Sequence, residues 1–486
     1  MNPRIQKLRQ ESLNTHESLS PERALLVTRF YESGIAQKEA VPVQRALCFR
    51  HIMENKSLWI GDGELIVGER GPAPKATPTY PEICLHSLAD LEIIHSREKV
   101  SFEVTDPTRE DYEKRVIPFW EGKTIREKIF REMDPEWIAA YEAGIFTEFQ
   151  EQRTPGHTVL GDKIYKKGFL DIQADIRAAL AEIDYFGDPA AMEKRQQLQA
   201  MEIAADGLIA YAERHAEELD RRAEAETETD SNRRSELRRM AEICRRVPAH
   251  APATFWEALQ YYWFVHVGVI TELNPWDAFN PGRLDQHLYP FYKREIEAGT
   301  LTAEQARELL QAFWIKFNNH PSPPKTGVTA KESNTYTDFA LINLGGLTEN
   351  GSDGVNDLTY LMLDVIEEMR LLQPSSMVQV SKKNPDRFVK RALKIIRTGF
   401  GQPSVFNTDA IVQELVRQGK RIEDARCGGA SGCVESGAFG KEAYFLTGYF
   451  NIPKILELTL YNGTDPMTGK IIGIQTGPVQ QVADFE

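Results

Sequence analysis

Cysteine is scarce in this sequence, and the common metal and nucleotide motifs are missing. The 486 residues contain five cysteines, at positions 48, 84, 244, 427 and 433. So few in so long a chain exclude a disulfide framework. Cys84 and His86 lack the spacing of a zinc finger. Neither a G-x-x-x-x-G-K-[ST] phosphate loop nor a G-x-G-x-x-G run after a strand occurs. The chemistry of this chain must therefore come from other residues.

Long apolar runs are also absent. No stretch of about 18 apolar residues occurs, and the first 26 residues are polar, without the apolar centre of a secretion signal. The formal charge of −14 is spread along the chain, which argues against a nucleic-acid-binding surface. With 41% hydrophobic residues, the chain can bury a large core. These features predict a soluble protein of the reducing cytoplasm, with no membrane or nucleic-acid partner.

The first half of the chain has the pattern of a helical region. Ser20 is a suitable N-cap for a helix whose first position is Pro21. Residues 171–247 are rich in Ala, Glu and Arg and predict two surface helices joined near 229–232. "PATFWEALQYYWFVHVGVI" begins with a capping box and is apolar nearly all round, so we expect a buried helix there.

Short β-like runs alternate with helices in the second half. The runs are 339–346, 375–382 and 403–407, and a helical pattern follows each one. We expect Asn384 to cap the helix whose first position is Pro385. Strands about 30 residues apart with helices between them are typical of βα units. The sequence therefore predicts an α/β protein with a parallel sheet, either open or closed into a barrel.

One glycine-rich stretch surrounds a cysteine. In "GGASGCVESGAFGKEAY", residues 428–444, five glycines fall within 13 residues, and Glu435 follows Cys433 at a distance of two. So much glycine disfavours helix and strand and predicts a loop that allows close approach. A thiolate catalyst needs a positive neighbour, whereas Glu435 disfavours the thiolate. A neutral thiol beside a proton-transferring carboxylate suits hydrogen-atom exchange through a thiyl radical. The alternative is an inert thiol, which is our expectation for the other four cysteines.

Other polar residues stand in unusual surroundings. His157 lies between glycines after a proline, Asp277 lies beside aromatic residues, and Ser333 precedes a β-like run. Each could line a site, although such residues are often satisfied structural groups. We expect Arg283 and Asp285 to form a buried ion pair or a turn.

The sequence resembles the glycyl radical enzymes. "SGCVES" is similar to their cysteine loop, and "PGRLDQHLYPFY", "WIKFNNHP" and "GQPSVFN" are similar to other motifs of the family. "LWIGDGELIVGER", "EQRTPGHTV" and "TELNPWDAFNPGRLDQHL" resemble the branch that dehydrates trans-4-hydroxy-L-proline. The resemblance covers essentially the whole chain.

The resemblance implies a fold and partners. The expected fold is a ten-stranded α/β barrel made of two antiparallel five-strand halves and wrapped by helices. Residues 1–486 would be a partial pyruvate formate-lyase-like catalytic domain, helical over about 1–250 and barrel-forming over about 251–486. No bound cofactor is implied beyond a glycyl radical, which a radical S-adenosylmethionine activating enzyme installs in anaerobic cells. The family implies a homodimer.

The resemblance also implies residue roles. Cys433 would carry the thiyl radical, and Glu435 would transfer protons. His157 and Asp277 would hold the substrate's polar groups. The remaining expected substrate contacts are Ser333, Phe149, Phe339 and Tyr449. The implied reaction converts trans-4-hydroxy-L-proline to Δ1-pyrroline-5-carboxylate and water.

Several alternatives stay open. Cys-x-Glu is shared with glycerol and diol dehydratases, choline lyases and arylacetate decarboxylases, and Ala430, Ser436 and Pro275 depart from the pattern expected for the hydroxyproline branch. A non-catalytic truncated subunit and an ionic thiol hydrolase are further possibilities. Pyruvate formate-lyase chemistry needs a second adjacent cysteine, and Val434 stands there instead.

The R-V-x-G-Y-like motif that carries the family's radical glycine does not occur in this sequence. Gly448-Tyr449 follows Leu-Thr instead. We therefore expect a fragment or one half of a split enzyme, which a C-terminal partner fragment would complete. An exposed apolar face is expected where the remainder would pack.

A direct prediction concerns the radical itself. Anaerobic incubation of the 486-residue chain with the activating enzyme should produce no glycyl doublet in electron paramagnetic resonance. A doublet arising from this chain alone would refute the expectation that the radical glycine lies elsewhere.

Overall fold

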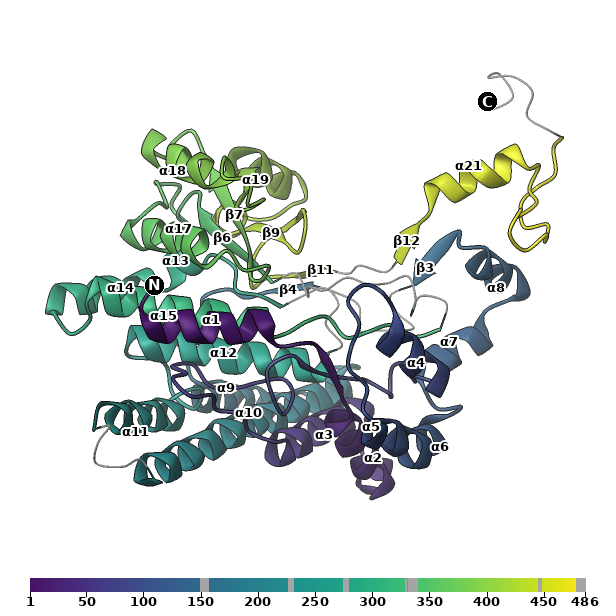
Figure 1. Ribbon diagram of the computed structural model, residues 1–486, viewed down its shortest axis with the longest axis horizontal. Coiled ribbons are helices and arrows are strands. Elements are labelled where there is room, and N and C mark those ends of the chain that lie inside the picture. The colour runs from purple at the N-terminus through teal and green to yellow at the C-terminus, as the bar shows by residue number, and fades with distance from the viewer. Residues whose placement is uncertain are drawn as a thin grey trace.

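The computed structural model describes residues 1–148, 157–225, 231–273, 279–327, 330, 340–444 and 448–477 (Figure 1). The first part of the chain is mainly helical. Its elements up to residue 148 are α1 Pro3–Asn14, β1 Ser18–Ser20, α2 Glu22–Glu32, η1 Ile35–Lys38, α3 Val41–Asn55, β2 Ala76–Pro78, α4 Leu88–Ser96, α5 Asp106–Asp111, η2 Tyr112–Val116, α6 Ile117–Trp120, α7 Ile125–Glu132, α8 Pro135–Glu142 and β3 Phe146–Glu148.

Helices and short strands continue through the middle of the chain. These elements are β4 His157–Val159, η3 Lys163–Tyr165, α9 Phe169–Ala181, α10 Ala191–Ala225, α11 Ser231–Arg246, α12 Phe255–Glu272, β5 Phe279–Asn280, α13 Leu284–His287, α14 Tyr289–Ala298 and α15 Ala303–Asn318. The last part contains β6 Leu341–Gly345, α17 Asp357–Met369, β7 Ser375–Val380, α18 Asp386–Ile396, β8 Ser404–Asn407, α19 Thr408–Arg417, α20 Ile422–Arg426, β9 Gly429–Ser431, β10 Glu435–Gly437, β11 Ala443–Tyr444, β12 Gly448–Phe450 and α21 Ile452–Leu460.

Helix α12 forms the centre of the core. Thr254 and Glu257 make the expected capping box, and Phe255, Trp263 and Phe264 are fully buried. The helix is apolar all round because α10, α11, α14 and α15 pack against it. Helix α10 is 35 residues long and packs against α3, α9 and α11, so it is more than the surface helix that its charges predicted. One hydrophobic cluster runs from Ile5 to Ile395, so the helical and βα parts share a core.

A run of parallel strands forms the second layer. Strands β6, β7 and β8 are parallel neighbours, with Leu341 paired to Ser375 and Met377 to Ser404. Strands β4 and β5 are also parallel. A bridge between Gly282 and Ile342 joins the two sets in the order β4–β5–β6–β7–β8. The parallel sheet predicted from the sequence is therefore present, and α17 and α18 make the returns between its strands.

Two helix starts differ from the sequence prediction by one position. Helix α2 begins at Glu22 with Pro21 as its N-cap, because Ser20 is engaged in strand β1. Helix α18 begins at Asp386 with Pro385 as its N-cap. Asn384 instead accepts a hydrogen bond from the Ser381 N–H at 2.7 Å and donates to the Gly346 carbonyl at 2.8 Å. Contacts within and between the βα loops thus take the place of the expected cap at Asn384.

Apolar side chains are exposed near the C-terminal end of the described residues. Strand β12 pairs with β3, and helix α21 projects away from the body of the molecule (Figure 1). The exposed fractions of Phe450, Ile452 and Met467 are 68%, 72% and 73%. Such a patch is typical of a surface that packs against further protein, as the sequence predicted. Within the described residues, no helix is long and apolar enough to cross a membrane.

Candidate active site: the cysteine hairpin

Cys433 lies at the tip of a tight β-hairpin. Strands β9 and β10 are antiparallel, with Ser431 paired to Glu435, so only residues 432–434 form the turn. Gly432 has a φ of 53°, a left-handed conformation that glycine adopts without steric cost. The expected irregular loop is therefore a short hairpin, because pairing between its two arms and contacts to the sheet outweigh the weak strand propensity of glycine. Cys433 is exposed at the turn.

The Glu435 carboxylate holds this turn. Its Oε2 accepts hydrogen bonds from the backbone N–H groups of Cys433 and Val434, both at 3.0 Å. A carboxylate that accepts two backbone hydrogen bonds fixes a turn that glycine alone would leave loose. The acid next to the cysteine thus has a structural task, and its position keeps a carboxylate beside the thiol-bearing residue.

The glycines at the base of the hairpin permit close packing. A Cβ at Gly428 would lie 2.4 Å from the Gly437 carbonyl oxygen. A Cβ at Gly429 would lie 2.2 Å from Gln379 Nε2 and 2.4 Å from Asn343 Oδ1. Real Cβ atoms do not approach so closely. Gly429 therefore lets the backbone lie directly on side chains of the sheet, and Gly428 lets the two arms of the hairpin approach closely. The sequence could indicate this only as a general tolerance of close approach.

Substituting one of these glycines should be severe. We expect Gly429→Ala to lower the free energy of unfolding by about 3 kcal/mol or more, since a methyl group must displace buried side chains. The matched variant is Gly399→Ala, where φ is 76° and no atom lies within 4 Å. That variant should cost only about 1–2 kcal/mol of backbone strain. Urea unfolding of both chains measures the difference, and equal losses would contradict the close packing.

Three buried side-chain amides of the parallel sheet contact the hairpin. Asn280 on β5, Asn343 on β6 and Gln379 on β7 have exposed fractions of 0%, 0% and 1%. The sequence patterns did not indicate them. The available signal was Asn343, which is the only polar residue of an otherwise apolar β run, since a buried polar side chain needs a specific partner. Gln379 gave a weaker signal, because its run also contains serines.

The structure describes only some of the other predicted site residues. His157 begins strand β4, where it pairs with Tyr444 of β11, and β4 contacts β9. The backbone of His157 is thus near the cysteine hairpin. Tyr449 lies on β12 opposite Thr147, and Figure 1 shows β12 well away from β9. The remaining predicted residues, Asp277, Ser333, Phe149 and Phe339, lie outside the described residues.

Arg283 and Asp285 form hydrogen bonds with the end of strand β6 and its neighbours rather than with each other. Arg283 donates hydrogen bonds to the carbonyls of Gly345 and Arg426, which join the end of β6 to the start of the hairpin segment. Asp285 Oδ2 accepts from the Gly345 N–H at 2.8 Å and from Thr359 Oγ1 at 2.6 Å. Both residues are buried structural groups at the start of α13, and among the described contacts neither the expected ion pair nor a turn separate from that helix occurs.

Asp285 should make stability depend on pH. Burial raises the pKa of Asp285 from 3.8 to about 6, outweighing its hydrogen bonds and Arg283. The folded chain then keeps a proton that the unfolded chain loses, so stability falls as pH rises from about 4 to 6. About two pKa units correspond to about 3 kcal/mol. Relative to wild type, Asp285→Asn should therefore gain about that much between pH 4 and 7 in urea unfolding. A pH-independent difference would contradict this.

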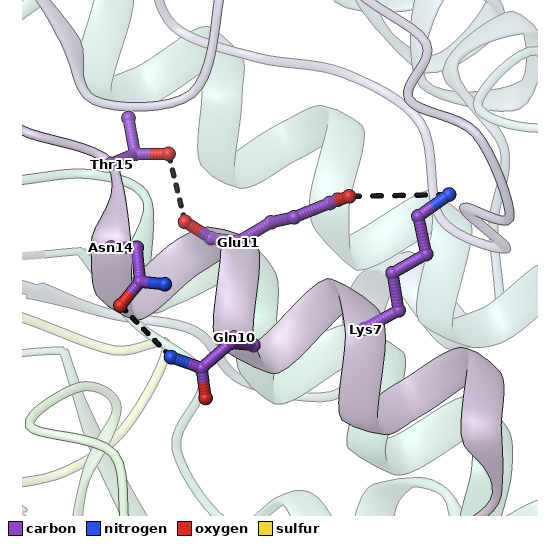
Figure 2. A pocket seen from close by; sticks show the side chains of 5 residues that line it. All are labelled: Lys7, Gln10, Glu11, Asn14 and Thr15. Carbon is purple, nitrogen blue, oxygen red and sulfur yellow. Dashed lines mark hydrogen bonds and ion pairs between the residues drawn. The ribbon is translucent and has the colours of Figure 1, made fainter.

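Two hollows on the molecule lie away from the hairpin. Figure 2 shows a hollow of about 450 Å³ along α1, lined by Lys7, Gln10, Glu11, Asn14 and Thr15. Its polar groups bond one another, with Gln10 donating to Asn14 at 2.9 Å and Thr15 Oγ1 donating to the Glu11 carbonyl at 2.8 Å. A larger apolar hollow of about 730 Å³ lies among α3, α9, α10 and α12. Over the described ranges, no group of three or more His, Cys, Asp or Glu side chains could hold a metal ion.

The cysteine hairpin lies on a parallel sheet, and helices pack against that sheet. This arrangement indicates the class of protein. The pyruvate formate lyase-like family model matches residues 1–486, and the chain belongs to this family. Two solved relatives show the same α/β fold: a glycyl radical enzyme from Archaeoglobus fulgidus, with 30% identity and a TM-score of 0.88, and the B12-independent glycerol dehydratase from Clostridium butyricum, with 30% identity and a TM-score of 0.90. The matches cover 99% and 98% of this chain and 61% and 60% of those chains.

Similarity is greater to a dehydratase of a hydroxylated amino acid. The chain is 56% identical over 483 residues to trans-4-hydroxy-L-proline dehydratase from Clostridioides difficile, which covers 99% of this chain. The crystal structure of hydroxyproline dehydratase from that organism, with trans-4-hydroxy-L-proline bound, has a TM-score of 0.94 over 98% of this chain. The match spans 61% of the relative's sequence and 60% of the solved chain. The predicted family and fold class are confirmed, while closure into ten strands stays a prediction.

Proposed function

We propose that this chain is the cysteine-bearing part of a glycyl radical dehydratase that converts trans-4-hydroxy-L-proline to Δ1-pyrroline-5-carboxylate and water. The observation that carries the proposal is 56% identity along the whole chain to a dehydratase of that substrate. The hairpin supports it, because Cys433 and Glu435 stand together on one rigid turn. Relatives named for other substrates, such as (2S)-3-sulfopropanediol dehydratase and the B12-independent glycerol dehydratase, are about 30% identical to this chain over the matched residues.

The proposed reaction begins and ends at the Cys433 sulfur. A glycyl radical, supplied through a radical S-adenosylmethionine activating enzyme, provides the unpaired electron when present. The Cys433 thiyl takes a hydrogen atom from ring carbon 5, so an S–H bond forms as a C–H bond breaks. The hydroxyl on carbon 4 then leaves as water, taking its proton from a nearby acid. The ring nitrogen releases a proton, which restores that acid, and the sulfur returns its hydrogen atom to carbon 4. This regenerates the thiyl and leaves a double bond between carbon 5 and the nitrogen, so the net loss is one water.

Glu435 is the proposed proton carrier in this reaction. Only its Oε2 is committed to the turn, where it accepts the two N–H groups. A carboxylate has two oxygens and about four acceptor positions, so Oε1 can exchange a proton while Oε2 keeps the turn closed. His157, on the strand beside β9, and Asp277 are proposed to hold the substrate's polar groups. Ser333, Phe149, Phe339 and Tyr449 are proposed to complete the pocket.

The family also supports a proposed assembly. We expect a cytoplasmic homodimer in an anaerobic cell. The exposed apolar side chains of α21, among them Ile452 and Leu456, are a surface suited to packing against further protein.

The test uses a version of the chain extended to the length of its relatives and activated anaerobically. Incubation with trans-4-hydroxy-L-proline should yield Δ1-pyrroline-5-carboxylate, measured by its adduct with an aromatic amine aldehyde. Glycerol, 1,2-propanediol, choline and arylacetates serve as matched substrates in the same assay. Turnover of one of these without turnover of hydroxyproline would refute the substrate and place the chain with another branch of the family.

A further inference from the structure

Strand β9 is held on the sheet by side chains as well as by backbone. Asn343 forms a pair of hydrogen bonds with the backbone of Ala430: its Oδ1 accepts from the Ala430 N–H at 3.1 Å, and its Nδ2 donates to the Ala430 carbonyl at 2.9 Å. This is the pattern by which one strand residue binds another. The amide of Asn343 therefore takes the place of a neighbouring strand for β9.

Two more amides extend this contact on either side. Gln379 Nε2 donates to the Gly428 carbonyl at 3.0 Å and to Asn343 Oδ1 at 3.1 Å. Asn280 Nδ2 donates to Ser431 Oγ at 2.8 Å. The three side chains come from the consecutive strands β5, β6 and β7 and contact residues 428, 430 and 431. Together they span the arm of the hairpin that leads to Cys433.

This contact fixes the register of β9. Sliding the strand by one residue would move it about 3.3 Å and leave several buried amide groups unpaired, which is costly. Gly429 lies between the amides, where no Cβ fits. Cys433 follows Ser431 by two residues. The position of its sulfur relative to the sheet therefore depends on that register.

We propose that Asn280, Asn343 and Gln379 are positioning residues. By fixing the register of β9 on the sheet, they fix where the turn that bears the Cys433 thiol lies relative to the sheet. They do not touch the reacting atoms. Asn343 and Gln379 act through the backbone of residues 430 and 428, and Asn280 acts through the Ser431 hydroxyl. The catalytic consequence of these contacts rests on the proposed function. A displacement of about 1 Å at a reacting group costs about 10²-fold in rate, so a loose hairpin lowers turnover even when substrate binding is unchanged.

The first test uses the 486-residue chain and needs no activity. In hydrogen–deuterium exchange, Asn343→Ala should speed exchange in peptides covering 428–437 by about tenfold or more, because the Ala430 N–H loses its buried acceptor. Gln260→Ala is the matched control. Gln260 makes the same two-bond contact with the backbone of Val67, both at 2.9 Å, and is 2% exposed. That control should leave the exchange of 428–437 unchanged.

The second test measures turnover in the extended, activated protein. Asn343→Ala should lower kcat per radical by about 10²-fold with KM nearly unchanged, whereas Gln260→Ala should lower only stability. Gln379→Met, which fills the same volume without the amide, provides a second variant if Asn343→Ala does not fold. It should also speed exchange at 428–437 and lower kcat.

The outcomes separate the two proposals. Unchanged exchange at 428–437 in both hairpin variants, or faster exchange with unaltered kcat, would overturn the positioning role. Faster exchange in a protein whose wild type does not turn over hydroxyproline would refute the proposed function while supporting the control of the hairpin by these amides.

Discussion

Cys433→Ser should abolish turnover of trans-4-hydroxy-L-proline in the extended, activated protein. A serine hydroxyl does not exchange a hydrogen atom as a thiol does, because its O–H bond is much stronger than the S–H bond. We expect kcat to fall by at least about 10⁴-fold, equivalent to about 5.5 kcal/mol of activation free energy. Because Cys433 is exposed at the turn, the substitution removes no core packing. Stability should therefore be preserved while activity is lost.

Cys427→Ser is the matched control for this substitution. Cys427 lies six residues earlier, is half-buried, and has a thiol whose pKa is raised by burial. It should keep turnover within a few-fold of wild type. The glycyl doublet in electron paramagnetic resonance should persist in both variants, which shows that the radical was installed. Substantial turnover by Cys433→Ser in the presence of that doublet would eliminate the thiyl mechanism.

Glu435→Gln should produce the second-largest loss. The amide oxygen of glutamine can accept the same hydrogen bonds from Cys433 and Val434, so the turn should be retained. An amide cannot exchange a proton in the way a carboxyl group does. We therefore expect kcat to fall by about 10²–10⁴-fold with little change in the free energy of unfolding, as is usual when a general acid or base is removed.

Glu435→Ala separates the two tasks of this side chain. It removes the proton carrier and the turn contacts together, so exchange at residues 432–434 should accelerate in this variant and remain slow in Glu435→Gln. The loss in stability should be about 1–2 kcal/mol, because two partly exposed backbone groups lose a charged acceptor. If Glu435→Gln retained full turnover, the carboxylate would have only its structural role.

Much of the fold was predictable from local patterns. The apolar face of α12 and its Thr254–Glu257 capping box predicted a buried helix, and the structure contains it. The β runs became β6, β7 and β8, because alternation of buried strands with capped helices restricts the possible topologies. The many charged residues of α10 predicted a surface helix and made its buried face hard to recognise in the sequence. One long helix can carry both a solvent-facing stripe and a core-facing stripe.

The candidate site was predictable in part. Cys433 and Glu435 were identifiable because a cysteine and an acid within a glycine-rich run are chemically distinctive. The roles of Asn343 and Gln379 could not be predicted in the same way. Asn343 is a single polar residue in an apolar strand, whereas Gln379 shares its strand with two serines. The hairpin partner of each lies about 50–90 residues further along the chain.

The sequence by itself determined the main helices and β runs of this protein, the cysteine–carboxylate pair and the family, because these are encoded in spacing and residue type. Only the tertiary structure decided where the thiol stands. The glycines first indicated only a tolerance of close approach, and the fold uses Gly429 to lay β9 against the buried amides. Long-range hydrogen bonds of this kind have no local signature, because they pair residues that meet only after the sheet has formed.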